Sequence, residues 1–323
     1  MSAELIIAII LGWILLSICF YLFSIVYASH CIYTQTLKRR SKEQWGRNPT
    51  FQSELSKQMD KEGLNWQKQH QAYKQDVHIF NQGLNLYGEY YDLGSDKAVM
   101  ILSGRTDSLR YGYYFAKPYA DAGFNILVID SRAHGLSEGE YNTLGFEESK
   151  DAIAWVKFLE QTYSIKIVVF HGICIGAAGS MLAITSPDCP DCVKGIVTEG
   201  MFANFGESMK NHLIERKKLW FPVMQCIDFW CKKYTGHSMR KGPIDVISSL
   251  SKPLLMIQSK MDPYSTVDNA KILYDLCPTE DKKLVLYDRG DHSMLRVTDT
   301  QKYDSEITLF LHRLIATCNE QTA

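Results

Sequence analysis

The sequence predicts an α/β fold in which a mostly parallel, eight-stranded sheet is flanked by helices. From Val77 onward, short β-branched and apolar runs of strand length alternate with longer runs of helical periodicity. This alternation is typical of a parallel sheet that is covered on both faces. A glycine-spaced turn, Gly172-Ile173-Cys174-Ile175-Gly176, also joins one strand-like run to a helix-like run. Periodicity and turn chemistry therefore point to the same fold class.

The expected elements follow one another along the chain in a regular order. The strands comprise an antiparallel opening pair at residues 77–80 and 84–91, and six later strands that begin at Ala98, Asn125, Lys166, Val193, Pro253 and Lys282. Helices are expected over residues 113–122, 146–163, 175–184, 267–277 and 302–317. Residues 203–251 contain no clear strand and carry aromatic side chains at helical spacing, so a helical excursion is expected there.

The turn around Cys174 has the G-x-nucleophile-x-G spacing of a strand-to-helix elbow, with cysteine where serine is usual. A nucleophile on such a tight turn needs glycine neighbours, because the strand and the helix must approach each other closely. Cys174 is therefore predicted to be the nucleophile. The alternative is a buried structural cysteine, since free cysteine is among the most buried residue types.

Two later strands end in groups that can activate a thiol. The run 252–259 leads into Asp262, and the run 282–287 leads into His292. An imidazole that takes the thiol proton makes cysteine a competent nucleophile, because an ordinary thiol is mostly protonated at neutral pH. His292 is predicted to be this base. Asp262 is predicted to fix its tautomer, and Glu199, at the end of the preceding strand, is the alternate acid.

These motifs resemble those of the α/β-hydrolase superfamily, in which nucleophile, acid and histidine follow in this chain order. Residues 130–137 are similar to its D-x-R-G-H-G-x-S segment, with Ala133 in place of a glycine. The cysteine elbow looks like that of dienelactone hydrolases and some acyl-CoA:amino acid N-acyltransferases. The resemblance implies an oxyanion hole made by the backbone N–H groups of Ile175 and Arg105, and it implies that residues 203–251 form a cap over the site.

The activity that the resemblance implies is hydrolysis of an ester or thioester through an acyl-thioenzyme. Two other classes of function stay open. The chain could be an acyltransferase that passes the acyl group to an acceptor other than water. It could also be a non-catalytic, membrane-tethered scaffold on a hydrolase fold, because a fold does not dictate a function. The aromatic residues of the cap suggest a small-molecule or lipid-like acyl substrate.

Residues 5–28 are predominantly apolar and carry no charge, which predicts one N-terminal transmembrane helix, since about 20 such residues cross a bilayer. A cleaved signal peptide usually starts with basic residues, whereas Glu4 precedes this run. The basic cluster between Lys38 and Arg47 is expected to stay cytoplasmic, which places the catalytic domain in the cytoplasm. The predicted organisation is a membrane anchor (5–28), a basic and polar linker (29–75) and a hydrolase domain (76–323). The single-pass, membrane-anchored layout is similar to one type of α/β-hydrolase-domain protein.

The composition narrows the remaining possibilities. The net charge is −1, which gives no reason to expect a nucleic acid partner. The sequence has no phosphate-binding G-x-x-x-x-G-K motif and no metal-ligand cluster, so neither a cofactor nor a metal is expected. Cys189 and Cys192 have C-x-x-C spacing, but without a second pair they are expected to lie in a loop. Nine cysteines, an odd number, suit a reducing compartment. No oligomeric state is predicted.

Overall fold

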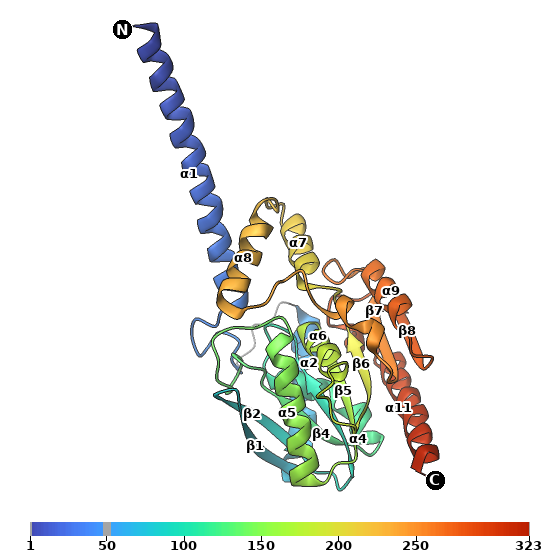
Figure 1. Cartoon of the computed structure of the whole chain (residues 1–323). Helices are drawn as coiled ribbons and strands as arrows, with labels where there is room; N and C mark the ends of the chain where they lie inside the picture. Colours follow the sequence, from blue (N-terminus) through green and yellow to red (C-terminus); the bar gives the residue numbers. More distant parts are fainter. Residues whose placement is uncertain (1, 48–52, 323) are drawn as a thin grey trace.

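The computed structural model describes residues 2–47 and 53–322, and its centre is a sheet with helices on both faces (Figure 1). The strands are β1 (Lys74–Asn81), β2 (Leu84–Tyr91), β3 (Lys97–Leu102), β4 (Asn125–Ile129), β5 (Ile167–Ile173), β6 (Val193–Glu199), β7 (Leu254–Ser259) and β8 (Lys282–Tyr287). They lie in the order β1-β2-β4-β3-β5-β6-β7-β8. β2 is antiparallel to β1 and β4, and all later neighbours are parallel. The prediction of a mostly parallel, eight-stranded sheet is confirmed.

The helices alternate with the strands from β3 onward. They are α1 (Ala3–Leu37), α2 (Glu54–Gln69), α3 (Leu109–Gly112), α4 (Lys117–Asp121), α5 (Phe146–Tyr163), α6 (Ile175–Ile184), α7 (Phe205–Glu215), α8 (Val223–Thr235), α9 (Val267–Leu276), α10 (Leu295–Thr298) and α11 (Thr300–Thr322). Short 3-10 turns cover Gln71–Tyr73, Tyr113–Phe115, Pro243–Asp245 and Ile247–Ser249. The single helix expected over residues 113–122 is wrong: a 3-10 turn and the separate α4 occupy it. Pro118 lacks the N–H that would bond to the preceding turn.

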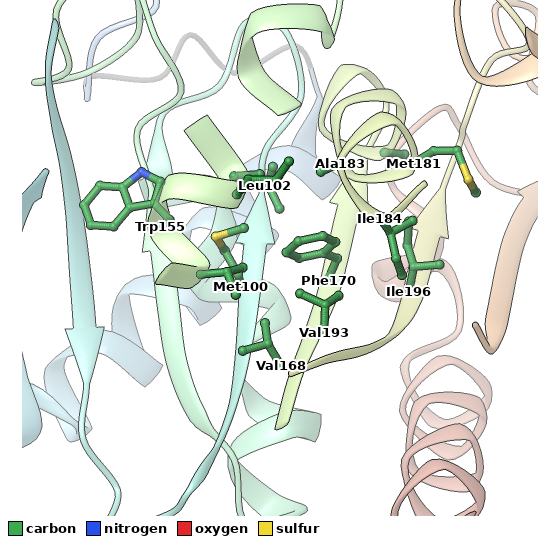
Figure 2. Close-up of a cluster of buried hydrophobic side chains, with 14 of the residues drawn as sticks. Met100, Leu102, Trp155, Val168, Phe170, Met181, Ala183, Ile184, Val193 and Ile196 are labelled. Atoms are coloured by element: carbon green, nitrogen blue, oxygen red, sulfur yellow. The ribbon is translucent and has the colours of Figure 1, made fainter. Parts of the chain in front are cut away.

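One face of the sheet packs against α5, α6 and α9. Figure 2 shows Trp155 of α5 and Met181 of α6 beside Phe170 and Met100 from the strands, and all four are fully buried. Side chains in a strand alternate between the two faces. Val169 of β5 therefore points to the opposite layer, where it packs with residues of α2, α4 and α11. Because both faces are covered, the central strands are apolar throughout.

A third apolar cluster joins the end of α1 to α6, α7 and α8. Tyr33 and Leu37 of α1 are buried in it with Ile227 of α8. The Trp230 indole Nε1–H donates to Ser29 Oγ at 3.1 Å, so a polar contact also joins the two helices. Part of the predicted 29–75 linker is thus packed on the domain. Figure 1 shows the rest of α1 projecting beyond it.

α1 is the one helix in the described part of the chain that is long and apolar enough to cross a membrane. It begins at Ala3 and ends at Leu37, so it extends past both ends of the predicted 5–28 segment. The helical excursion predicted for residues 203–251 contains α7 and α8. These two helices lie between the projecting end of α1 and the carboxyl ends of the central strands (Figure 1).

Candidate active site

Cys174 lies in a strained backbone conformation between β5 and α6. Its φ is +54° and its ψ is −113°, a combination that costs free energy in a residue with a side chain. Its N–H donates to the Glu199 carbonyl at 2.9 Å, which ties the turn to the end of β6. A Cβ on Gly172 would lie 2.4 Å from Ala177 Cα, and one on Gly176 would lie 2.1 Å from the Leu102 carbonyl oxygen. Both glycines are therefore sterically required for the turn.

His292 and Asp262 come together from the loops after β8 and β7. His292 Nδ1 lies 2.5 Å from Asp262 Oδ2, and Asp262 is buried. The other carboxylate oxygen, Oδ1, accepts the N–H groups of Tyr264 at 2.8 Å and Ser265 at 3.0 Å. One oxygen thus holds the loop while the other holds the histidine. The helix that follows, α9, has its own N-cap in Thr266, whose side chain accepts the Asn269 N–H.

The charge on His292 depends on its two neighbours. Burial works to lower the pKa of His292, but Cys174 and the hydrogen bonds with Asp262 and Cys174 outweigh burial and raise this pKa well above its usual value. His292 therefore has Asp262 and Cys174 as its two neighbours, which is the arrangement that a cysteine–histidine pair requires. Gly200, with φ +61°, leaves space for the His292 ring, because a Cβ at this position would lie 3.1 Å from His292 Cε1.

Glu199, the alternate acid, has other hydrogen-bond partners. Its carboxylate accepts the Leu295 N–H at 2.9 Å and the Tyr303 hydroxyl at 2.7 Å. Tyr303 in turn lies 3.1 Å from His171 Nε2. Burial raises the pKa of Glu199 and lowers that of His171 to about 3. Of the two candidate acids, Asp262 makes the hydrogen bond with His292, and Glu199 belongs to a buried network beneath it.

The backbone N–H groups of Ile175 and Arg105 are both unpaired among the described residues. Ile175 is the first residue of α6, where an N–H has no partner within the helix. Arg105 follows Gly104, and a Cβ on Gly104 would lie 3.7 Å from Cys174 Cβ. Two free donors therefore border the cysteine from separate elements, as binding of a developing oxyanion requires.

The Arg105 side chain is directed toward the end of α1. Its Nη1 donates to the Thr36 carbonyl at 3.0 Å. The Arg105 carbonyl contacts His134 Nε2, and the His134 ring stacks on Trp45 with centroids 4.7 Å apart. The segment around His134, which the sequence analysis singled out, therefore supports the loop that carries the Arg105 N–H. This loop is also joined to the helix that leaves the domain.

The sequence analysis missed four side chains that lie around the site. Asp107 interacts electrostatically with Arg105 and His292, and its burial raises its pKa to about 6. Tyr111 donates its hydroxyl to the Ser293 carbonyl. Tyr264 packs edge-on against His292 at 5.7 Å, and His212 of α7 stacks on Tyr264 at 3.7 Å. Only Tyr264, two residues after Asp262, has a signal in the sequence.

Residues 203–251, the predicted cap, for which we keep the name cap, do not place all of their apolar and aromatic side chains inward. Leu219, Trp220, Phe221 and Phe229 are exposed, whereas Val223 and Ile227 are buried. A cavity of about 300 Å³ is lined by residues of α7 and α8 and of the segments after them, including Trp220, but not by Cys174 or His292. Within the described ranges, no group of three histidine, cysteine, aspartate or glutamate side chains is arranged to hold a metal ion.

The chain is similar to an uncharacterised protein of Bacillus subtilis, YqkD, with 30% identity over 220 residues that cover 67% of this chain and 71% of YqkD. It is 19% identical, over 181 residues, to an uncharacterised membrane protein of Saccharomyces cerevisiae, YNL320W, covering 56% of this chain and 59% of that protein. No protein-family model matches the chain.

Two solved structures have the same fold. An esterase of Pyrococcus furiosus, Pf2001, superposes with a TM-score of 0.64 at 21% identity and covers 84% of this chain and 98% of its own. The α/β hydrolase GrgF of Penicillium sp. sh18 superposes with a TM-score of 0.61 at 15% identity, covering 75% of this chain and 99% of its own. At these identities the likeness establishes the fold.

Proposed function

This chain belongs to the family of Bacillus subtilis YqkD and has the α/β-hydrolase fold, and from that premise we propose that it is a membrane-anchored hydrolase of ester or thioester bonds. Cys174 is the nucleophile, His292 the general base and acid, and Asp262 the group that orients His292. One observation carries the proposal. The strained Cys174 lies at a helix start against a histidine whose far nitrogen is held by a buried carboxylate.

In the acylation step, the Cys174 thiol proton passes to His292 as the sulfur attacks the carbonyl carbon of the substrate. The carbonyl oxygen takes up negative charge, and the N–H groups of Ile175 and Arg105 stabilise it. The tetrahedral intermediate then expels an alcohol or a thiol, which leaves with the proton from His292. The product of this half-reaction is a thioester between the acyl group and Cys174.

In the deacylation step, water takes the place of the leaving group. His292 removes a proton from the water as its oxygen attacks the acyl carbon, and the same two N–H groups stabilise the second oxyanion. Collapse of the intermediate releases the carboxylic acid and returns the proton to the Cys174 sulfur. Asp262 accepts the N–H of His292 Nδ1 and stabilises the imidazolium that forms in each half-reaction.

The membrane part of the proposal rests on α1. Residues 5–28 are predominantly apolar, this stretch begins two residues after the start of α1, and one relative is described as a membrane protein. The basic residues between Lys38 and Arg47 lie next to the end of α1. Since such residues stay on the cytoplasmic side, we propose that the hydrolase domain faces the cytoplasm.

The first test is labelling of the purified full chain with a thiol-directed activity probe, with the modified residue located by mass spectrometry. Fast labelling of Cys174 should disappear in Cys174→Ala and should fall at least roughly 10²-fold in His292→Ala, because loss of the base leaves an ordinary thiol. Cys226, another partly exposed cysteine, provides the control, since Cys226→Ala should leave labelling of Cys174 unchanged.

Turnover then separates the candidate activities. A panel of acyl esters and thioesters should release free acid with the wild type, and Cys174→Ala should lose at least roughly 10³-fold in rate. Product that appears only when an amine, alcohol or thiol acceptor is added would identify an acyltransferase instead. Labelling of Cys174 no faster than that of Cys226, together with no turnover, would contradict the enzyme and favour a scaffold.

A further inference from the structure

The connection between α7 and α8 carries three consecutive exposed apolar side chains of the hydrolase domain's cap. We call residues 216–222 the cap tip. Leu219 is 54% exposed, Trp220 40% and Phe221 58%. Phe229, on α8, is exposed as well, at 57%. A soluble protein rarely gathers large apolar side chains on one exposed loop unless that loop contacts a partner or a membrane.

The cap tip leads into α8, the helix that packs on α1 where α1 leaves the domain. Residues 3–23 of α1 are all exposed, whereas Ile25 and Ser29 are buried and the latter bonds to Trp230 of α8. At 1.5 Å per residue, the exposed stretch is about 31 Å long, close to the ~30 Å of a bilayer's hydrocarbon core. Figure 1 shows α8 against the lower part of α1 and the connection to α7 on the side toward which α1 projects.

If residues 3–23 span the bilayer, its surface meets the protein where α8 begins to pack on α1. The cap tip is then level with the headgroups, without any change in the orientation of the domain. Its composition suits that depth. Trp220 is an aromatic residue with a polar edge, the kind that is enriched at membrane interfaces, and Leu219 and Phe221 flank it.

The charges of the cap tip favour anionic lipid. Arg216, Lys217 and Lys218 are exposed directly before the apolar triplet. Lys210 lies over the Trp220 ring at 4.7 Å, so a fourth cation accompanies the indole. Glu215 is the one acidic residue among residues 210–222. An apolar patch bordered by cations is the composition of segments that lie in the surface of a negatively charged membrane.

We propose that the cap tip is a second membrane contact, in which Leu219, Trp220 and Phe221 lie among the headgroups of an anionic bilayer beside α1. This contact rests on the membrane anchoring in the proposed function, and it does not depend on the chemistry of Cys174. It also bears on the substrate. His212 of α7 stacks on Tyr264, which packs against His292, so the same cap that meets the bilayer borders the active site. The substrate class it fits is an acyl ester or thioester presented at the membrane surface.

The contact can be tested by quenching of tryptophan fluorescence in the full chain, reconstituted as single copies in nanodiscs of phosphatidylglycerol and phosphatidylcholine whose acyl chains are brominated close to the headgroups. Bromine quenches an indole only at contact distance. The quenched part of the emission should fall in Trp220→Phe and in Trp13→Phe, which lies within the exposed part of α1. It should not change in Trp66→Phe, because Trp66 is buried against the domain.

The three variants separate the two proposals. Quenching that falls in Trp13→Phe but not in Trp220→Phe would overturn the cap-tip contact and leave the anchor intact. Absence of quenching at Trp13 would overturn the anchor and the contact that rests on it. If Trp220 becomes shielded only when two copies share a nanodisc, the partner of the cap tip is a second copy of the chain, and the contact with lipid is wrong.

Activity provides an independent readout. The triple variant Leu219→Ser/Trp220→Ser/Phe221→Ser should hydrolyse a long-chain ester in anionic vesicles at least roughly fivefold more slowly, because apolar contact with the bilayer is lost. Hydrolysis of a short, water-soluble ester by the same variant should stay within twofold of the wild type, which also shows that the variant is folded. An equal loss on both substrates would contradict a role at the membrane surface.

Discussion

The elbow end of the sheet and the cap differ in how tightly their side chains are constrained. Around Cys174, backbone atoms fill the space that a Cβ on Gly172 or Gly176 would need, and the carboxylate of Asp262 has four hydrogen-bond partners. In the cap, Phe221 and Phe229 are mostly exposed, and the connection between α7 and α8 is a loop. The elbow therefore holds individual groups in fixed positions, whereas the cap exposes apolar side chains on its surface.

This difference indicates where the molecule tolerates change. Groups that transfer protons or stabilise charge have to be placed to within a fraction of an ångström, so backbone and buried hydrogen bonds hold them. A region that contacts a membrane needs only a suitable distribution of apolar and charged side chains. Substitutions should therefore be costly at the elbow and mild in the cap, except where the two regions are joined.

The largest effect is expected from the two buried carboxylates at the strand ends. Asp262→Asn should lower kcat/KM about 10³–10⁴-fold, because the neutral amide does not stabilise an imidazolium and its NH2 group, facing His292 Nδ1, favours the wrong tautomer. Glu199→Gln should cost less than about 10-fold, since Glu199 bonds to Leu295 and Tyr303. Initial rates of the two variants on one model ester show which carboxylate orients His292. Equal losses for the two variants would make Glu199 a second orienting group.

The next effect tests the steric constraint at the elbow. Gly176→Ala should destabilise the fold by about 3 kcal/mol or more, because the new Cβ meets the backbone of Leu102 at 2.1 Å. Gly179→Ala, on the same helix, is the matched control. Its nearest contacts are at 3.5 Å, so it should be neutral or stabilising by up to about 1 kcal/mol. Thermal unfolding in detergent measures the stability change of each variant. Similar losses of stability for the two variants would contradict a special steric constraint where α6 approaches β3.

The third effect tests the junction between the two regions. Arg105→Ala removes the hydrogen bond to Thr36 and should lower kcat about 10-fold with little change in KM, because in the proposed mechanism the Arg105 N–H acts on the oxyanion and not on the ground state. Arg105→Lys should recover part of the loss. Lys38→Ala, which breaks an exposed ion pair with Glu140, should change kcat less than about twofold. A change in KM alone would contradict a positioning role.

A smaller effect depends on pH. Burial raises the pKa of Asp107 from its ordinary 3.8 to about 6 in the folded chain. The unfolded chain ionises this group first, so folding becomes less favourable as pH rises from 3.8 to about 6, and the cost is complete above that. Asp107→Asn should therefore stabilise the protein by about 1–2 kcal/mol at pH 8, less than the full shift implies because the side chain is partly open to solvent, and by much less at pH 4.

The control for this prediction is Asp188→Asn, which alters an exposed carboxylate and should change stability by less than about 0.5 kcal/mol at both pH values. Unfolding midpoints at pH 4 and pH 8 measure the difference. If Asp107→Asn has the same effect at both, the neighbouring Arg105 and His292 balance the charge of Asp107.

The smallest effect is expected in the cap. Phe229→Ser should change the free energy of unfolding in detergent by less than about 0.5 kcal/mol, because the side chain is 57% exposed. Ile227→Ala, two residues earlier on the same helix and fully buried, should cost about 2–4 kcal/mol. A large cost at Phe229 would mean that the exposed face of α8 packs more tightly than the cap as a whole.

Local patterns were sufficient for much of the fold. Side-chain periodicity predicts the eight strands, the antiparallel opening pair and most helices. It does so because the burial pattern of a strand or helix determines which of its consecutive residues are apolar. The helix expected at 113–122 was wrong because Pro118 divides it. Cys174, Asp262 and His292 were predicted from strand-end positions, and the structure brings the latter two into contact.

The remaining features depend on contacts between distant segments, which the sequence does not encode locally. No residue near Glu199 in the sequence indicates that its carboxylate accepts a hydrogen bond from Tyr303, 104 residues away. Likewise, no residue near Arg105 indicates its hydrogen bond to the Thr36 carbonyl. Asp107 and His212 approach the site only because two loops and α7 converge there. The aromatic residues of the 203–251 segment looked the same in sequence whether they face the interior, like Phe205, or solvent, like Phe221.

By itself, then, the sequence determined the fold class, the elbow at Cys174 and the apolar length of α1, since each depends on residues that are neighbours along the chain. The tertiary structure decided which carboxylate holds His292, which carbonyl holds Arg105 and which apolar side chains of the cap stay exposed beside α1. These are decided in three dimensions because hydrogen bonding and burial depend on distances between segments that only folding brings together.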